Sequence, residues 1–182
     1  MTDAEVIERS VGDGNLFAAL YDRHHGEIYR FVRARVGSDL ADDLAAETFV
    51  VAFRRREAYD CSHADARPWL FGIAVRLVHR HRRVEKRRLR AYARSAGDGR
   101  DSEQPEVQLD PELAAALLTL DASERTLILL HAWAGLSYQQ LADALSLPLG
   151  TVRSRLHRTR RKLRVAIAAE VPLPRVPEGV TP

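Results

Sequence analysis

Arginine side chains are concentrated near the end of the chain, in a segment whose pattern predicts contact with nucleic acid. Residues 150–166 contain no acidic residue, whereas a helix that only faces water usually mixes both charge signs. The planar guanidinium fork of arginine pairs well with phosphates and with the guanine edge. The candidate base and phosphate contacts on this segment are Thr151, Arg153, Ser154, Arg155, His157 and Arg158.

The residues before this segment predict the first helix of a helix-turn-helix. Residues 138–145 place apolar side chains on one face, and Ser137 precedes them as an N-cap. Pro148 follows, and proline suits the first turn of a new helix. The apolar side of that second helix consists of Val152, Leu156, Thr159 and Leu163. A short helix, a tight turn and a longer basic helix are typical of major-groove readers.

A second basic segment lies in the middle of the chain. Residues 76–94 hold nine lysines and arginines against one acid, Glu85. We expect a helix here that begins after Asp65 as its cap and includes Trp69 near its start. Aromatic rings beside a basic track suit unpaired DNA, because bases stack and phosphates are negative. The candidate contacts are Trp69, Arg76, Arg80 and Arg83, although a place in the core explains Trp69, taken alone, slightly better.

The segment before it combines acids with phenylalanines. Upstream apolar residues predict two helices broken near Gly26 and Gly37, and Ser38 then caps a helix over residues 39–56. Acids in its first turns and arginines in its last complement the helix dipole. One stripe mixes acids with aromatic rings and resembles a protein-docking surface: Asp42, Asp43, Glu47, Phe49 and Phe53. A position of the phenylalanines in the core explains the same pattern equally well.

Composition and length restrict the protein class. The 182 residues carry a net charge of +3 and a single cysteine, which rules out an internal disulfide framework and fits a reducing cytoplasm. We find neither a signal peptide nor an apolar run long enough to span a bilayer, so we expect a cytoplasmic protein without membrane insertion. His79 and His81 are spaced poorly for a shared metal on a helix. We therefore expect no catalytic residue, metal or other cofactor.

The chain is expected to fold as an all-α protein with two small helical domains joined by a flexible linker. Residues 1–94 form the N-terminal domain, and residues 95–109 form a Gly-, Ser- and acid-rich linker. The C-terminal domain, residues 110–169, contains the helix-turn-helix. Residues 170–182 form a proline-rich tail.

Three segments together resemble the extracytoplasmic-function (ECF) sigma factors of bacterial RNA polymerase, a subfamily of the sigma-seventy family. They are DLADDLAAETFVVAFRR (residues 39–55), RPWLFGIAVRLVHRHRR (residues 67–83) and the stretch from LTLDASERTLILL to HRTRRKL (residues 118–163). Their order and the intervening linker also match the family. The last segment alone occurs in other helix-turn-helix regulators.

The resemblance implies a sigma factor that binds core RNA polymerase and directs promoter-specific initiation, in response to an external or stress signal. The first segment, through the acidic and aromatic residues given above, would dock on core polymerase. The second would recognise and melt the minus-ten element, with a base pocket within residues 57–66. The helix-turn-helix would read the minus-thirty-five element as duplex. The partners would be core polymerase, duplex and melted promoter DNA, and an anti-sigma factor.

Two positions depart from the family pattern. Arg76 stands where the family often has asparagine, and Ala46 stands where it often has glutamine. Two other functions remain open on the sequence. A stand-alone helix-turn-helix regulator would bind duplex operators without polymerase, usually as a dimer. A metal-dependent nuclease would cleave DNA when magnesium or manganese is added, which a sigma factor would not do.

Overall fold

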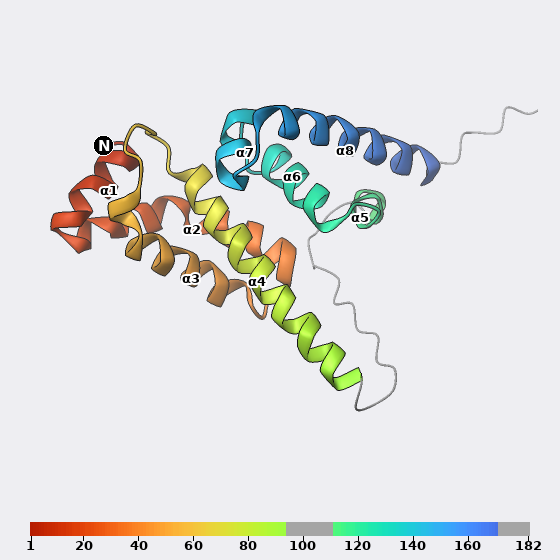
Figure 1. The fold of residues 1–182 in the computed structure, drawn as a ribbon, viewed down its shortest axis with the longest axis horizontal. Coiled ribbons are helices and arrows are strands. Elements are labelled where there is room, and N and C mark those ends of the chain that lie inside the picture. Colours follow the sequence, from red (N-terminus) through yellow and green to blue (C-terminus); the bar gives the residue numbers. More distant parts are fainter. Residues whose placement is uncertain (94–110, 171–182) are drawn as a thin grey trace, which may run out of the picture.

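The computed structural model describes residues 1–93 and 111–170, which form an all-helical structure (Figure 1). The N-terminal part comprises α1 (Asp3–Gly12), a 3₁₀ turn (Gly14–Phe17), α2 (Ala18–Val36), α3 (Ala41–Arg54), a second 3₁₀ turn (Arg56–Ala58) and α4 (Arg67–Ala93). The C-terminal part comprises α5 (Pro111–Leu118), α6 (Ala122–Ala132), α7 (Tyr138–Leu145) and α8 (Leu149–Glu170). The all-α prediction is confirmed, and the predicted linker lies outside the described residues, as does the predicted tail after residue 170.

The N-terminal domain packs α2, α3 and α4 around one core, with α1 laid against α2 and the second 3₁₀ turn. Rings from different helices meet edge to face in this core, as in the Phe31–Phe71 pair with centroids 5.4 Å apart. Leu20, Ile28 and Leu70 have at most 1% of their surface exposed. The core therefore fixes α4, whose outer side carries the basic track.

Two helix boundaries differ from the prediction. Helix α2 runs through Gly26 without a break, because Ile28, Phe31 and Val32 continue its buried face. The helix ends instead at Gly37, whose φ of 81° lies in the region that glycine adopts without strain. Helix α3 begins at Ala41 rather than at residue 39, and no side chain caps its first turn. The hydroxyl of Ser38 donates to the Asp39 carboxylate at 3.1 Å.

The C-terminal domain contains the predicted helix-turn-helix. Helix α7 has the predicted bounds and begins with a capping box, in which the Ser137 hydroxyl accepts from Gln140 N–H and the Gln140 amide accepts from Ser137 N–H. Ser146 adopts a left-handed conformation with φ 53° and turns the chain into α8. Val152, Leu156 and Thr159 of α8 are fully buried, as predicted.

Helix α1 was not predicted, although its start carries a recognisable signal. Thr2 and Glu5 form a capping box of the Thr-x-x-Glu type. None of the helices within residues 1–93 and 111–170 combines the length and apolarity that crossing a membrane requires.

Candidate nucleic-acid interfaces

Helix α8 presents its basic side chains on the face opposite its buried stripe. Arg153, Ser154, His157 and Arg158 are all exposed, and Thr151 and Arg155 are half-exposed beside them. The Arg158 Nε donates to the Ser154 carbonyl at 3.4 Å, and its two terminal nitrogens make no hydrogen bond to any described residue. The structure thus brings the six predicted residues together on one accessible turn-and-helix surface, with arginine donors available to an external acceptor.

A polar brace holds α8 against α6 and α7. Arg160 donates to the Tyr138 hydroxyl at 3.0 Å and to His131 Nε2 at 2.6 Å. His131 Nδ1 lies 2.8 Å from the Leu136 carbonyl. Because a carbonyl can only accept and a guanidinium can only donate, His131 is the neutral tautomer with its proton on Nδ1. Arg160 is therefore a structural residue of the helix-turn-helix.

The candidate contacts on α4, unlike those on α8, include side chains that neighbouring residues already engage. Arg76 and Arg83 are exposed, but Arg80 donates to Glu47 of α3 at 2.5 Å. Partial burial, with a smaller effect of Arg55, lowers the pKa of Arg76 below its usual value, and the guanidinium stays charged. Trp69 is half-buried against Tyr59, with ring centroids 4.9 Å apart. Trp69 also packs against the hydrophobic core of the domain, and part of its surface stays exposed.

The loop before α4 is tied to the N-terminus of the chain by one buried carboxylate. Asp3 accepts from the Ala66 N–H at 3.1 Å, from Arg23 at 3.0 Å and from His24 at 2.8 Å. Burial raises the pKa of Asp3, but these hydrogen bonds and the nearby histidine outweigh burial and hold the pKa below 3.8. Asp3 thereby fixes where α4 starts, a role that the sequence analysis did not identify.

The proposed docking stripe on α3 is only partly accessible. Asp42 and Asp43 are exposed. Phe49, however, has 5% of its surface exposed and packs on Tyr21, with centroids 4.9 Å apart. Phe49 is thus a core residue in this structure, because α2 covers that side of α3, and its inclusion among the surface contacts was wrong. Phe53 is half-buried between Phe17 and Arg56.

Helix α3 has a valine, not Phe49, on its exposed face. We call this face, with Asp42, Ala46 and Val50, the outer stripe. Val50 is 47% exposed and follows Asp42 and Ala46 at intervals of four residues on α3. Val50 was not predicted, although its four-residue spacing from Asp42 and Ala46 places it on the same face of α3. Glu47, which is half-exposed, is shared between this stripe and Arg80 of α4.

The two domains contact each other through α4 and α7. At Gly72 an added Cβ would lie 2.6 Å from the Ala144 carbonyl oxygen, so a backbone of α7 approaches α4 where α4 has no side chain. Gln140 of α7 donates to Asp65 at 2.9 Å. Arg67 bonds Glu27 at 3.1 Å and also reaches the Ala134 carbonyl. We call this set of contacts the closed interface.

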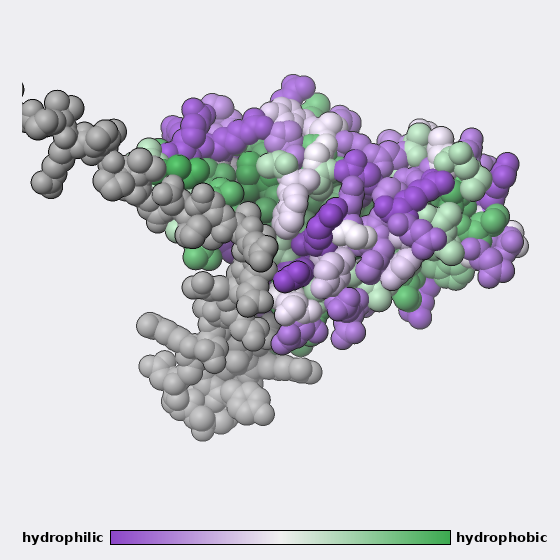
Figure 2. Space-filling model, turned by 180° about the vertical axis from the view of Figure 1, so that it is seen from behind, coloured by the Kyte–Doolittle hydropathy of each residue, from purple (hydrophilic) through white to green (hydrophobic). Residues whose placement is uncertain are grey.

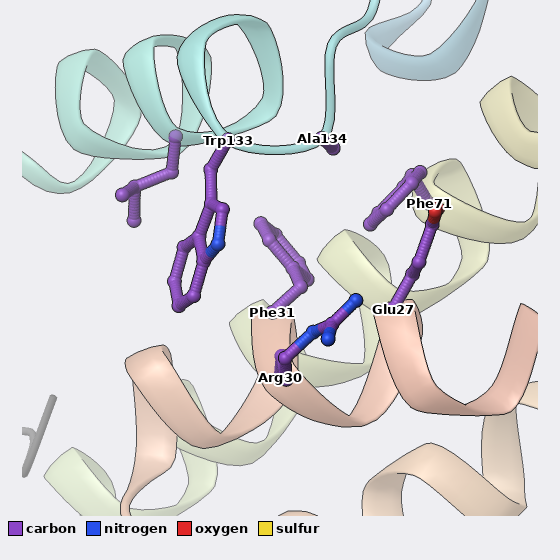
Figure 3. Close-up of a pocket in the computed structure, with 7 residues that line it drawn as sticks. Glu27, Arg30, Phe31, Phe71, Trp133 and Ala134 are labelled. Carbon is purple, nitrogen blue, oxygen red and sulfur yellow. The ribbon is translucent and has the colours of Figure 1, made fainter.

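A small pocket lies beside the closed interface, between α2, α4 and α6 (Figure 3). Figure 3 shows Trp133 reaching down from the end of α6 towards Phe31 and Arg30 of α2. Trp133 is 44% exposed. Hydrophilic side chains cover most of the coloured surface in Figure 2.

Comparison with known sequence families matches both domains. Residues 20–88 match the family described as Sigma-70 region 2, and residues 111–163 match Sigma-70, region 4. The ECF RNA polymerase sigma factor SigK of Mycolicibacterium vanbaalenii is 30% identical over 171 residues, which cover 89% of this chain and 87% of that protein. SigL of Mycobacterium tuberculosis is 29% identical over 174 residues, covering 90% and 96%.

Solved structures share the fold. CnrH, in complex with the cytosolic domain of CnrY, superposes with a TM-score of 0.68 at 24% identity over 93% of this chain and 99% of that chain. RpoE of Bartonella quintana, in complex with the anti-sigma factor NepR, gives 0.67 at 22% identity over 85% and 98%. The arrangement of helices is therefore one that known proteins adopt.

Proposed function

Because the chain belongs to the ECF RNA polymerase sigma factors, which direct promoter-specific transcription initiation, we propose that its surfaces divide promoter recognition between the two domains. Residues 110–169 read duplex DNA, and residues 1–94 bind core polymerase and the melted strand. The observation that carries the proposal is the accessible, acid-free face of α8 on a domain that matches region 4 of the family. Because such a protein acts on DNA together with polymerase, we assign it to the cytoplasm.

The face of α8 is assigned to the minus-thirty-five element. Arg153 and Arg158 supply forked donors for base edges or phosphates, and His157 lies between them. The brace from Arg160 to α6 and α7 keeps the helix rigid. Rigidity supports specificity here, because a donor that is already positioned loses little conformational entropy on binding.

The α4 track is assigned to the minus-ten element. Trp69 offers one ring for stacking, and Arg76, Arg80 and Arg83 follow it along the outer side of α4 for the phosphates. Asp3 supports this surface indirectly, since it fixes the loop that precedes the helix. The arginine at position 76 adds a charge where the family often has a neutral amide.

The outer stripe of α3 is assigned to polymerase docking. Asp42 and Asp43 supply negative charge, and Val50 and Phe53 supply apolar surface beside it. Charged rims around a small apolar centre are common at protein interfaces. An anti-sigma factor is also proposed as a partner, in line with the NepR complex of RpoE.

The closed interface must open for both elements to be read. Sites centred ten and thirty-five positions upstream lie about 25 base pairs apart, or roughly 85 Å at about 3.4 Å per base pair. In this structure α4 and α7 are in direct contact. One chain can engage both elements only after the two domains separate, so we assign the closed interface to the protein free of polymerase.

Run-off transcription on genomic promoter fragments tests the proposal. Core polymerase supplemented with this protein should give new transcripts with defined start sites, and Arg158→Ala should reduce them. Arg33→Ala removes an exposed arginine of α2 instead and serves as the matched control. If the protein bound duplex DNA alone but neither joined polymerase nor yielded transcripts, a stand-alone regulator would replace this proposal.

A further inference from the structure

Arg35 of α2 is a buried cation at the meeting point of the two domains. Only 2% of its surface is exposed. One terminal nitrogen donates to the Ala122 carbonyl of α6 at 3.1 Å. The other two nitrogens, Nε and Nη1, are buried and have no hydrogen-bond partner among the described residues. Burial of a guanidinium with free donors is costly unless an anion compensates it.

Among the described residues, the two charges that act on Arg35 are both positive. Arg125 lies on the same helix as Ala122, one turn later, and its donors are turned to the carbonyls of Leu117 and Leu120 at 2.9 and 3.0 Å. Burial, then Arg82 of α4 and then Arg125, lower the pKa of Arg35 to about 10. Arg35 of α2, Arg82 of α4 and Arg125 of α6 therefore form a cluster of positive charge to which both domains contribute.

A histidine adds to this cluster. Partial burial lowers the pKa of His79 on α4, and the nearby Arg35 and Arg82 lower it further. At neutral pH His79 is therefore uncharged, which spares the cluster a fourth positive charge. The chemistry that satisfies such a cluster is an oxyanion, because several acceptor oxygens can take donors from more than one guanidinium.

We propose that Arg35, with Arg82 and Arg125 beside it, forms a site for a small phosphate anion enclosed between the two domains. The unpartnered donors of Arg35 supply the direct contacts. Arg82 and Arg125 are half-buried and flank the site, and they supply further positive charge. No other function is assigned to Arg35 in promoter recognition, and its burial removes it from any surface that duplex DNA can reach.

Burial also defines how the ligand enters and what it does. The backbone phosphates of a DNA duplex cannot reach Arg35, because only 2% of its surface is exposed in the closed structure. The ligand is therefore a free anion. It enters when the domains separate and is enclosed when they close. A bound anion stabilises the closed interface by mass action. Its consequence for transcription, a slower opening on polymerase, rests on the function proposed above.

The first test uses inorganic phosphate and the full-length protein, without polymerase or DNA. Thermal unfolding is followed as phosphate is increased, with sodium chloride at matched ionic strength as the reference. We expect the melting temperature to rise with phosphate and to saturate, and to rise less in chloride. Arg35→Gln should abolish the difference between the two salts, whereas Arg33→Gln, an exposed arginine on the same helix, should keep it.

Calorimetric titration of phosphate covers the case in which Arg35→Gln folds poorly. Arg82→Gln changes a half-buried flank of the site and should weaken phosphate binding severalfold. Equal melting curves in phosphate and chloride, or an undiminished phosphate response in both variants, would overturn the site. Neither assay contains polymerase or a promoter, so a failure here leaves the transcription test unaffected, and a failure of that test leaves this one unaffected.

Discussion

The two surfaces that we propose for nucleic acid are built differently. On α8, Arg153 and Arg158 are exposed on a helix whose opposite side is buried, and Arg160 holds that helix in place. On α4 the central arginine is paired with Glu47, the tryptophan is half-covered by Tyr59, and α7 lies against the helix at Gly72. A duplex presents its groove ready-made, so its reader can be rigid and open. A melted strand appears only during initiation, and neighbouring residues partly engage the α4 surface that we propose for it.

The largest expected effect is a loss of stability in Asp3→Ala, which alters the loop that supports the α4 surface and leaves α8 unchanged. Asp3→Ala leaves the Ala66 N–H, the Arg23 guanidinium and the His24 ring without their shared acceptor. We expect a loss of about 3 kcal/mol in unfolding free energy, as for other buried networks that lose one member. Chemical denaturation measures it, and Glu8→Ala, on the exposed side of α1, is the control.

The same carboxylate predicts a pH dependence. Because the folded-state pKa of Asp3 lies below 3.8, its stabilisation is complete above that value and is lost as the pH falls through the lower folded pKa. Asp3→Ala should therefore lose stability at neutral pH and little at strongly acidic pH. A stability difference from wild type that stays constant down to the lowest pH would refute the role of the ionised carboxylate.

A second variant, Gly72→Ala, tests the contact of α4 with α7 and leaves the exposed face of α8 unchanged. Gly72→Ala places a methyl group 2.6 Å from the Ala144 carbonyl, so we expect the closed interface to lose about 2 kcal/mol, as in other overpacked contacts. Small-angle scattering should show a more extended molecule. Gly26→Ala meets nothing within 4 Å on α2 and should instead stabilise the protein by about 0.5–1 kcal/mol. A Gly72→Ala protein as compact as wild type would contradict the assignment.

The third variant tests the open surface alone. Arg158→Ala should weaken binding to the minus-thirty-five duplex by about 1–2 kcal/mol if the side chain contacts a base. Arg160→Ala should instead lower the stability of the C-terminal domain, because His131 and Tyr138 lose their shared partner. Fluorescence anisotropy with duplex DNA, together with thermal unfolding, distinguishes the two. An unchanged base preference in Arg158→Ala would show that this arginine contacts only the backbone.

The smallest effect concerns the ion pair that restrains the α4 track. Glu47→Gln releases Arg80, and the loss in stability should stay below about 0.5 kcal/mol, since both side chains reach solvent. Binding of a single-stranded oligonucleotide to the free protein should become slightly tighter, because one more cation is available. Weaker binding would mean that Glu47 orients Arg80 productively rather than restraining it.

Local signals made the helix-turn-helix predictable. The capping residues Ser137 and Gln140, the turn before Pro148 and the buried spacing from Val152 onward all lie within a few residues of one another. The basic faces of α8 and α4 followed from the same periodicity. Local pattern was misleading at Gly26, because packing of the residues after it outweighs the helix cost of one glycine.

Contacts between residues that are distant in the sequence could not be predicted from local patterns. Whether Phe49 faces solvent or α2 depends on the neighbour that covers α3, and the periodicity of α3 fits both. The approach of Gly72 to Ala144 joins two domains across 72 positions, and nothing near Gly72 in the sequence signals it. The burial of Arg35 likewise arises from α6, which lies far along the chain.

The central claim is that the domains are closed in the free protein and separate on the promoter. Cys61, the single cysteine, is exposed in the loop before α4, and Arg161→Cys adds a second on the exposed side of α8. Spin labels on both allow the distance to be measured by pulsed electron resonance. The free protein should give one short distance, which lengthens by several tens of ångströms once core polymerase and promoter DNA are bound. One unchanged distance in both states would contradict the account.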